Sequence, residues 1–409
     1  MIFEYLKKIG IKIYFGGLKM TNLEFNEIED YVIRTRRFLH ENPELSGEEL
    51  NTSDFLKKEV TDMGLEIYNV KGTGFYSILD SGKPGKTLGL RTDIDALPIL
   101  ESEYNLKGYR KCRSKLDGVF HACGHDGHMA ILLGSMRVLI ENKDSFSGKL
   151  IFIFEEGEER GCGIDAMVEA LSNYKLDAIY GNHLSSSMNT GSVSAKSGPV
   201  LAGSAMVDFT IRGRGGHASR PDLSISPIFA ATNVINGIAS AWSNRLDVKN
   251  TVTLGLSTIN GGTAYNVIPN EVRVTGTLRF FDVLEGQKAV NLIKKVGDLT
   301  AQAHECEFID NGIVLKAQSV VNDKGLAELF SQVINDYLED YELVEEIWFA
   351  SESFAKYRSI APLLFTFIGT KNDDLGSGAE HHNELFDIDE DSLIIGVKTM
   401  VHFALSFLN

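Results

Sequence analysis

Short, continuous runs of apolar residues set the strongest limit on how this chain can fold. Leu150–Phe154 is apolar at every position, and Leu363–Ile368 forms a second strand-like segment. A strand with successive apolar side chains must be covered on both faces, which is typical of parallel sheets flanked by helices. Longer segments with helical periodicity separate these runs, so the sequence predicts an α/β architecture.

Polar clusters follow the predicted strands. The strand at 86–90 leads into Asp93 and Asp95, and the run at 150–154 leads into residues 155–159, Glu-Glu-Gly-Glu-Glu. A strand at 178–180 is expected to end at Gly181-Asn182-His183, and the strand at 363–368 precedes the loop that carries His381 and His382. Open α/β sheets bind ligands beyond the carboxyl ends of their strands, so these clusters are expected to share one edge.

The middle of the chain has a different pattern. Strands are predicted at 205–212, 251–260, 271–281 and 307–316, and helices at 227–244 and 284–304. The order β-α-β-β-α-β is that of a ferredoxin-like unit. We therefore expect a satellite domain at 201–315, inserted between two parts of a catalytic domain at 1–200 and 316–409.

Composition narrows the possible partners and compartment. The 409 residues are 43% hydrophobic and 23% charged, which suits a globular protein of two or three domains. A net charge of -16 opposes contact with nucleic acid and with anionic membranes, so neither is an expected partner. The widely spaced cysteines do not resemble a disulfide framework, and a cytoplasmic location is expected. They are Cys112, Cys123, Cys162 and Cys306.

Residues 1–20 have only a short apolar stretch interrupted by lysines. This segment is too short to span a membrane and lacks the features of a signal peptide. We interpret it as a possible extension, with Met20 as an alternative start to Met1.

The segment His121-Ala122-Cys123-Gly124-His125-Asp126-Gly127-His128 is the densest group of potential metal ligands. It holds three of the ten histidines together with a cysteine and an aspartate. Such ligands suit zinc, manganese, nickel or cobalt. The alternative is a helix start with a buried cysteine and surface histidines, but the density of ligands favours a metal centre.

Glu158 and Glu159 follow the buried run at 150–154. They could form a solvated acidic loop. Alternatively, one carboxylate binds a metal while the other stays free and takes a proton from a metal-activated water. His183 and the pair His381-His382 are weak signals when each is taken alone.

The middle segment holds further candidates. Gly213–His217 could be a simple hairpin loop with a chance histidine, and the segment 261–269, which holds Asn266, is similarly ambiguous. Arg279 could bind a substrate carboxylate through its planar fork, or it could make a surface salt bridge.

Together these blocks resemble the M20 metallopeptidase family, in particular its amidohydrolase branch of hippurate hydrolases, indoleacetyl-amino-acid hydrolases and N-acyl-amino-acid deacylases. The resemblance covers nearly all of the chain after Met20. It rests on Arg37–Ser46, Arg91–Pro98, His121–His128, Gly213–His217 and Asn266–Pro269.

The resemblance implies a mixed-sheet zinc-peptidase-like catalytic domain with a ferredoxin-like lid or dimerisation domain. It implies a homodimer or dimer-based oligomer that cleaves N-acyl or aryl-acyl amino acids, with two divalent ions (Zn, Mn, Ni or Co) per subunit. Cys123 would bridge the two metals, and Glu158 would be the general base. The other implied ligands are His125, Glu159, His183 and His382, with His382 preferred to His381 because it lies four residues before Phe386.

The resemblance also implies roles for residues of the satellite domain. His217 would reach across a dimer to complete the neighbouring site and stabilise the oxyanion. Asn266 and Arg279 would contact the carboxylate of the substrate.

The chain departs from the pattern of this branch at three places. It has Glu155-Glu156-Gly157-Glu158-Glu159 where Gln-Pro-Ala-Glu-Glu is common, and Glu352-Ser353-Phe354 where Glu-Asp-Phe is usual. The segment Ser224–Pro227 lacks the usual Asp before its proline. None of these departures removes a proposed ligand. They do weaken any transfer of a particular substrate from the family to this chain.

Three other functions are compatible with parts of the sequence. Cys123 could act as a nucleophile with His125 or His128 as its base. The chain could also be a non-catalytic binding protein on a hydrolase fold. Within the family, an aminopeptidase or dipeptidase is the nearest alternative.

Overall fold

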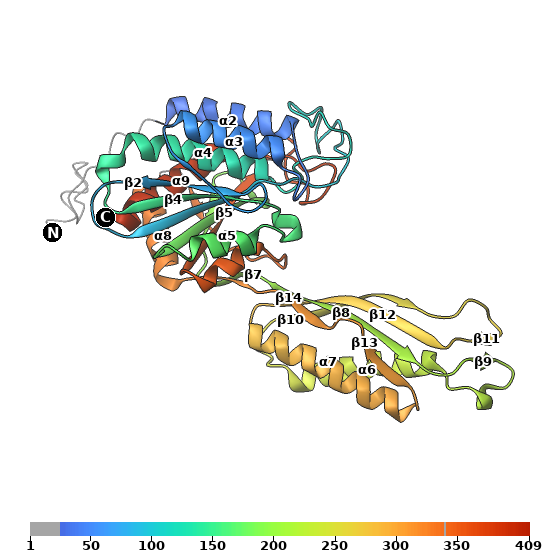
Figure 1. Cartoon of the computed structure of the whole chain (residues 1–409). Coiled ribbons are helices and arrows are strands. Elements are labelled where there is room, and N and C mark those ends of the chain that lie inside the picture. The colour runs from blue at the N-terminus through green and yellow to red at the C-terminus, as the bar shows by residue number, and fades with distance from the viewer. Residues whose placement is uncertain (1–24, 339–340) are drawn as a thin grey trace, which may run out of the picture.

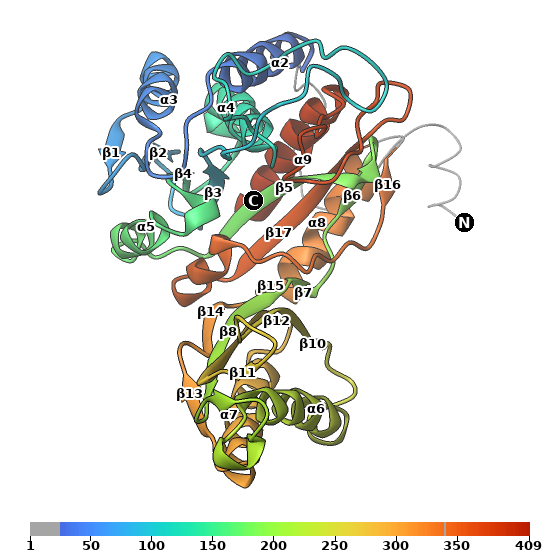
Figure 2. The same ribbon diagram turned by 90° about the vertical axis from the view of Figure 1, so that its right-hand side faces the viewer.

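The computed structural model describes residues 25–338 and 341–409, which form two units (Figure 1). The extension predicted at residues 1–20 lies outside the described residues. The larger unit contains both the beginning and the end of the described chain. The smaller unit is formed by residues 203–317 and lies below the larger unit in the view of Figure 2.

An eight-stranded sheet forms the centre of the larger unit, in the order β1-β2-β4-β3-β5-β17-β6-β16. Four adjacent strands, β4-β3-β5-β17, run parallel, and nearly all of their residues are buried. The carboxyl ends of these four strands therefore meet at one edge of the sheet. The strands of this sheet are β1 (Ile67–Asn69), β2 (Phe75–Asp80), β3 (Thr87–Asp93), β4 (Lys149–Glu155), β5 (Ala178–Asn189), β6 (Ser192–Ser194), β16 (Glu342–Leu343) and β17 (Leu363–Lys371).

Helices cover both faces of this sheet, as the continuous apolar strands require. One face carries the larger hydrophobic core, formed with α2 (Asn26–Glu41), α3 (Leu50–Asp62), α4 (His125–Glu141), α8 (Lys324–Tyr337) and α9 (Asp391–Leu408). The other face carries a second core, formed with α5 (Ile164–Leu171) and the 3-10 helix η4 (Ser353–Ser359). Short 3-10 helices are η1 (Lys143–Ser145), η2 (Glu158–Arg160) and η3 (Pro221–Leu223).

Helix α9 is long and apolar enough to cross a membrane by composition, with a mean hydropathy of 1.4. In the structure 83% of its residues are buried inside the larger unit. Its apolar sequence is therefore accounted for by packing against α4, α8 and the sheet.

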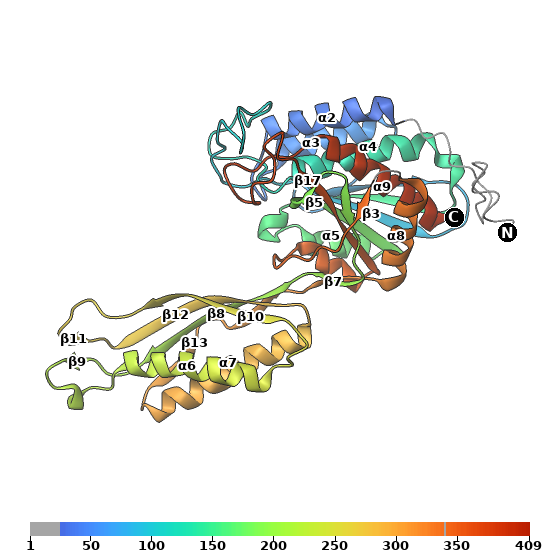
Figure 3. The same ribbon diagram turned by 180° about the vertical axis from the view of Figure 1, so that it is seen from behind.

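The smaller unit has the predicted order of elements. Its antiparallel sheet has the order β10-β12-β8-β13, and both helices pack on one face of it (Figure 3). This order is that of a ferredoxin-like unit. The elements are β8 (Gly203–Arg212), α6 (Pro227–Arg245), β10 (Val252–Asn260), β12 (Glu271–Phe280), α7 (Val283–Ala303), β13 (Glu307–Asp310) and β14 (Val314–Ala317).

The last predicted strand of this unit, 307–316, is in fact two strands. Both β13 and β14 pair with β8, but a turn separates them. The Asp310 carboxylate accepts hydrogen bonds from the backbone amides of Gly312 and Ile313, which takes these amides out of the ladder.

Two short pairs of strands complete the fold. The antiparallel pair β7 (Gly198–Leu201) and β15 (Val320–Asn322) lies where the chain passes between the units. The pair β9 (Gly216–His217) and β11 (Val267–Ile268) forms a ribbon at the end of the smaller unit that is farther from the larger one (Figure 1).

One strand differs from prediction in a way that affects the site. The strand predicted at 178–180 continues as β5 to Asn189, so His183 lies within the strand and does not follow it. Residues 181–185 keep pairing with residues 365–369 of β17. The Gly-Asn-His sequence resembles a turn, but its pairing with β17 keeps it extended.

Candidate metal centre

The structure brings all five predicted metal ligands together at the carboxyl edge of the parallel strands. Their donor atoms form two groups that share one sulfur, Cys123 with His125 and His183, and Cys123 with Glu159 and His382. Within each group the donor atoms lie within 4.8 Å of one another. A sulfur common to two groups of ligands suits two cations bridged by a thiolate.

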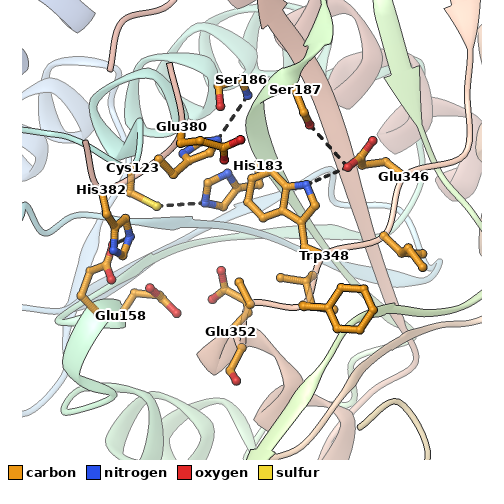
Figure 4. A pocket seen from close by; sticks show the side chains of 17 residues that line it. Cys123, Glu158, His183, Ser186, Ser187, Glu346, Trp348, Glu352, Glu380 and His382 are labelled. Carbon is orange, nitrogen blue, oxygen red and sulfur yellow. Dashed lines mark hydrogen bonds and ion pairs between the residues drawn. The ribbon is translucent and has the colours of Figure 1, made fainter. Parts of the chain in front are cut away.

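Four of these five residues, all except His125, line a pocket of about 540 Å³ (Figure 4). The Cys123 sulfur lies 3.4 Å from Nε2 of His183, and His382 Nε2 lies 3.1 Å from Glu159 Oε1. Separate elements supply the ligands: the loop before α4, the start of α4, η2, β5 and the loop after β17.

His125 is oriented by the turn before it and by Asp95. Gly124 has a φ of 89°, a left-handed conformation that glycine adopts without strain, and α4 begins at the next residue. His125 Nδ1 lies 3.0 Å from the carbonyl oxygen of Asp95 and 3.1 Å from its Oδ1, so this nitrogen donates its proton. The other nitrogen, Nε2, then presents a lone pair to the pocket, as in a metal-binding histidine.

Two buried atoms at the centre have no hydrogen bond within the described residues. They are Nε2 of His125 and Oε1 of Glu159, of which the second lies 3.1 Å from Nε2 of His382 without a hydrogen bond to it. Leaving buried polar atoms unpaired costs free energy, and a cation would satisfy both atoms at once. The residues present therefore fit a metal site.

His183 and His382 also turn Nε2 towards this centre. His183 Nδ1 lies 2.7 Å from the carbonyl oxygen of Leu184, so it donates there and leaves Nε2 facing Cys123. His382 has a left-handed backbone with a φ of 60°, which is uncommon outside glycine, and its amide donates to the carbonyl oxygen of Ala122.

His381 and His128 are engaged elsewhere. His381 Nε2 accepts a hydrogen bond from the backbone amide of Ser186 at 3.2 Å, and burial lowers the pKa of this histidine to about 3. His128 donates through Nδ1 to Asp93 Oδ1 at 2.8 Å and accepts at Nε2 from the Leu184 amide at 2.9 Å. With both ring nitrogens used, His128 holds β5 against α4.

Glu158 remains free of the two ligand groups that share Cys123. Its Oε1 accepts a hydrogen bond from the Ser353 amide at 3.1 Å. Burial, followed by the negative charges of Glu352 and Glu159, raises the pKa of Glu158 well above its usual value. Bound cations would oppose that shift, and a carboxyl balanced in this way is suited to accept and return a proton.

A buried arginine organises the carboxylates behind Glu158. Arg91 is 1% exposed and contacts Asp93 and Glu155 at 2.8 Å each, and Glu352 at 3.0 Å. Ser353 donates its hydroxyl to Glu155 Oε1, and Tyr357 donates to Glu155 Oε2 at 2.8 Å.

Two of the positions where the chain departs from the M20 pattern face each other here. Glu155 stands where glutamine is common, and Ser353 stands where aspartate is usual. Because Ser353 donates to Glu155, one negative charge is kept across the pair. The aspartate missing at 353 is thereby balanced by the extra carboxylate at 155.

The structure does not bring every predicted residue to this centre. His217 and Asn266 belong to the region of the β9–β11 ribbon, far from the larger unit (Figure 1). Arg279, on β12, donates to the hydroxyl of Ser351 at 2.6 Å, and Ser351 lines the pocket. Arg279 makes no ion pair with any residue in the described ranges, and burial lowers its pKa.

Sequence reasoning missed Trp348. Its ring packs against that of His183 with centroids 4.8 Å apart, and it forms a wall of the pocket (Figure 4). A tryptophan after two glutamates gives no sequence signal of its own. Glu352 was noted only as part of a motif, because its contact with Arg91 joins residues far apart in sequence.

Comparisons with known proteins agree with this geometry. The sequence profile of peptidase family M20/M25/M40 matches residues 89–406. Thermostable carboxypeptidase 2 of Saccharolobus solfataricus is 32% identical over 94% of this chain and 98% of its own length. IAA-amino acid hydrolase ILR1-like 5 of Arabidopsis thaliana is 34% identical (93% and 87%), and N-acetylcysteine deacetylase of Bacillus subtilis is 30% identical (92% and 97%).

Solved structures match over the whole fold. A protein from methicillin-resistant Staphylococcus aureus superposes with a TM-score of 0.85 at 30% identity, covering 94% of this chain and 98% of its own. A Bacillus subtilis protein described as a dinuclear metal-binding peptidase of the M20 family superposes with a TM-score of 0.81 at 27% identity (93% and 99%).

Replacement of Arg91 tests the buried charge network. We expect Arg91→Met to lower the free energy of unfolding by about 3–5 kcal/mol, because it leaves buried carboxylates without their cation. Urea unfolding measures this difference. The control is Arg212→Met, whose side chain is 53% exposed and pairs with Glu307 at the surface, and which should cost less than about 1 kcal/mol. Equal losses in the two variants would contradict the role given to Arg91.

Proposed function

The chain belongs to peptidase family M20/M25/M40, and on that basis we propose that it is a metal-dependent amidohydrolase that cleaves N-acyl amino acids to a carboxylate and a free amino acid. One observation carries the proposal. Five potential metal-ligand side chains lie together at a pocket that four of them line, and a further carboxylate in that pocket, that of Glu158, is proposed to transfer the proton.

The proposed ligands are Cys123, His125, Glu159, His183 and His382, with Cys123 shared between two divalent cations. A mixed set of sulfur, nitrogen and oxygen donors suits zinc, manganese, nickel or cobalt. Two such cations supply Lewis-acid chemistry, since they lower the pKa of a water and polarise a carbonyl oxygen.

Glu158 moves the proton in this proposal. Its Oε1 is held by the Ser353 amide, so Oε2 is the atom that takes a proton from the attacking water. The same carboxyl then gives this proton to the nitrogen of the leaving amino acid. The contacts behind it, from Ser353 to Glu155 and from Arg91 to Glu352, keep the carboxylate in one place.

Substrate contacts follow from the walls of the pocket. An apolar surface for the acyl group is formed by Leu201, Ile347, Trp348 and Phe349. Arg279 contacts Ser351 of the pocket wall and has no ion pair within the described part of the chain, so we assign it to the α-carboxylate of the amino acid. Asn266 is assigned to the same carboxylate.

His217 and Asn266 require a second subunit. Both lie in the distal part of the smaller unit, so they can act only at the site of another chain. We propose a homodimer in which His217 of each subunit stabilises the oxyanion in the site of its partner. We place the protein in the cytoplasm, which suits its four free cysteines.

A dipeptidase or aminopeptidase is the second candidate. Glu346 and Glu380 line the same pocket and could bind the ammonium group of an unblocked peptide. A comparison of dipeptides with their N-acetyl derivatives separates the two activities. A thiol mechanism is disfavoured, because burial and the charge of Glu159 raise the pKa of Cys123 well above its usual value.

Glu158→Gln tests the general base. We expect turnover of N-acetyl and N-benzoyl amino acids to fall by about two to four orders of magnitude, the usual contribution of a general base. Metal content, measured on the same sample, should stay unchanged because Glu158 is not a proposed ligand. Glu169→Gln, an exposed glutamate on α5, is the matched control and should keep full activity. Full activity in Glu158→Gln would refute the assignment.

Metal analysis tests the ligand set. We expect two divalent ions per chain, loss of activity on chelation and recovery when zinc or manganese is returned. Cys123→Ala should hold fewer than two ions, because both groups of donors share its sulfur. A chelated protein that keeps its activity would instead favour a thiol enzyme.

Mixed dimers test the role of His217. Glu158→Gln and His217→Ala should each be nearly inactive alone. When subunits of the two variants exchange, one site in each mixed dimer carries neither change, so activity should return to about a quarter of the wild-type value. No recovery, although mixed dimers are shown to form, would place His217 outside the neighbouring site.

A further inference from the structure

A second cavity, of about 910 Å³, lies beside the metal centre. It is bounded by η2, α5 and η4 of the larger unit and by the end of β14. It shares Glu158, Glu159, Ser351 and Glu352 with the pocket of Figure 4. A substrate whose amide bond lies at Glu158 therefore has the pocket of Figure 4 on one side and the second cavity on the other.

The second cavity contains several basic side chains that have no acidic partner among the described residues. Arg160, Lys316 and Arg358 line it, and none of them makes an ion pair with a residue of the described chain. Arg160 donates only to the carbonyl oxygen of Ser46, at 3.3 Å. Lys356 also lines this cavity, but it is neutralised by Asp165 at 2.7 Å.

The acidic side chains that line this cavity already have other partners or roles. Glu352 is paired with Arg91 at 3.0 Å, and Asp165 is paired with Lys356. Glu158 and Glu159 belong to the metal centre. Within the described part of the chain, three cations therefore line one cavity without an ion-pair partner, in a protein whose net charge is -16.

The pocket of Figure 4 has the opposite character. Among the residues that the structure describes, neither lysine nor arginine lines it, and its charged residues beyond the metal centre are acidic, among them Glu346 and Glu380. Its other walls combine apolar and aromatic side chains with three serines and His381. The two chambers thus differ in charge on the two sides of Glu158.

Building on the proposed function, we infer that the preferred substrates are N-acyl amino acids with an acidic side chain, such as N-acyl-glutamate or N-acyl-aspartate. The neutral acyl group occupies the apolar pocket, where an anionic acyl group would be repelled. The side-chain carboxylate enters the basic cavity and is attracted by Arg160, Lys316 and Arg358. Arg279 remains free for the α-carboxylate.

The test compares N-acetyl-L-glutamate with N-acetyl-L-glutamine, which have nearly the same shape and differ by one charge. With the metal-loaded enzyme at low ionic strength, kcat/KM should be about tenfold higher for the glutamate substrate, as expected for a carboxylate near several part-exposed cations. The preference should shrink as salt is added, because salt screens charges in an open cavity.

A triple variant assigns the preference to the cavity. Arg160→Gln combined with Lys316→Gln and Arg358→Gln should bring the ratio of the two kcat/KM values to about one. The control combines Lys71→Gln, Lys175→Gln and Lys295→Gln, which removes the same charge from exposed positions that do not line this cavity, and it should keep the preference. A wild-type ratio of one or less, or a preference that survives in the first triple variant, overturns the inference.

Failure of the proposed function gives a different result. An enzyme that cleaves N-acetyl-L-glutamine but shows no preference for the glutamate substrate keeps the proposed function and loses this inference. If no acyl amino acid is cleaved, the proposed function fails, and calorimetric binding of the two compounds to the metal-loaded protein still reports on the cavity. Equal affinity for the two compounds would then overturn the inference.

Discussion

The buried ion cluster around Arg91 is the interaction on which the site depends. Moving a charge out of water costs several kcal/mol, so an arginine that is 1% exposed must be compensated closely. Asp93, Glu155 and Glu352 supply that compensation, and they come from the ends of β3 and β4 and from the residue before η4. Although burial opposes it, the charges of these three groups hold the pKa of Arg91 well above its usual value. The cluster therefore fixes three segments in relation to one another.

Asp93 connects the ion cluster around Arg91 to the metal centre. Its second oxygen accepts from His128, and the other nitrogen of His128 accepts from the amide that follows His183. A set of direct contacts thus joins Arg91 to a proposed ligand, without a solvent-exposed side chain in between. On the other side, Glu158 is held by Ser353, which also donates to Glu155. The ligands and the base are held by the same network, so their separation is set by buried groups.

Much of the fold and of the metal centre could be predicted from the sequence, because short local patterns indicate them. The apolar run at 150–154 predicts a covered strand, and a covered parallel strand must end near its neighbours' ends. The density of histidine around Cys123 indicates a metal site before any contact between distant segments is known. Contacts between distant segments could not be predicted from the sequence. Nothing local indicates that Ser353 faces Glu155, 198 positions away, or that β5 continues through Gly181 because β17 lies beside it. The charge difference between the two cavities likewise appears only when η2, η4 and β14 are brought together.

The short pair β7–β15 has a consequence for how such proteins can change over evolutionary time. Leu201 and Val320 are directly paired, so the chain leaves the larger unit and returns to it at neighbouring positions. A segment whose two ends lie side by side can be lengthened, exchanged or lost without rethreading the sheet that carries the metal ligands. Natural variation can therefore act on the smaller unit, and on whatever it presents to a substrate, while the proposed metal ligands and Glu158 are inherited unchanged.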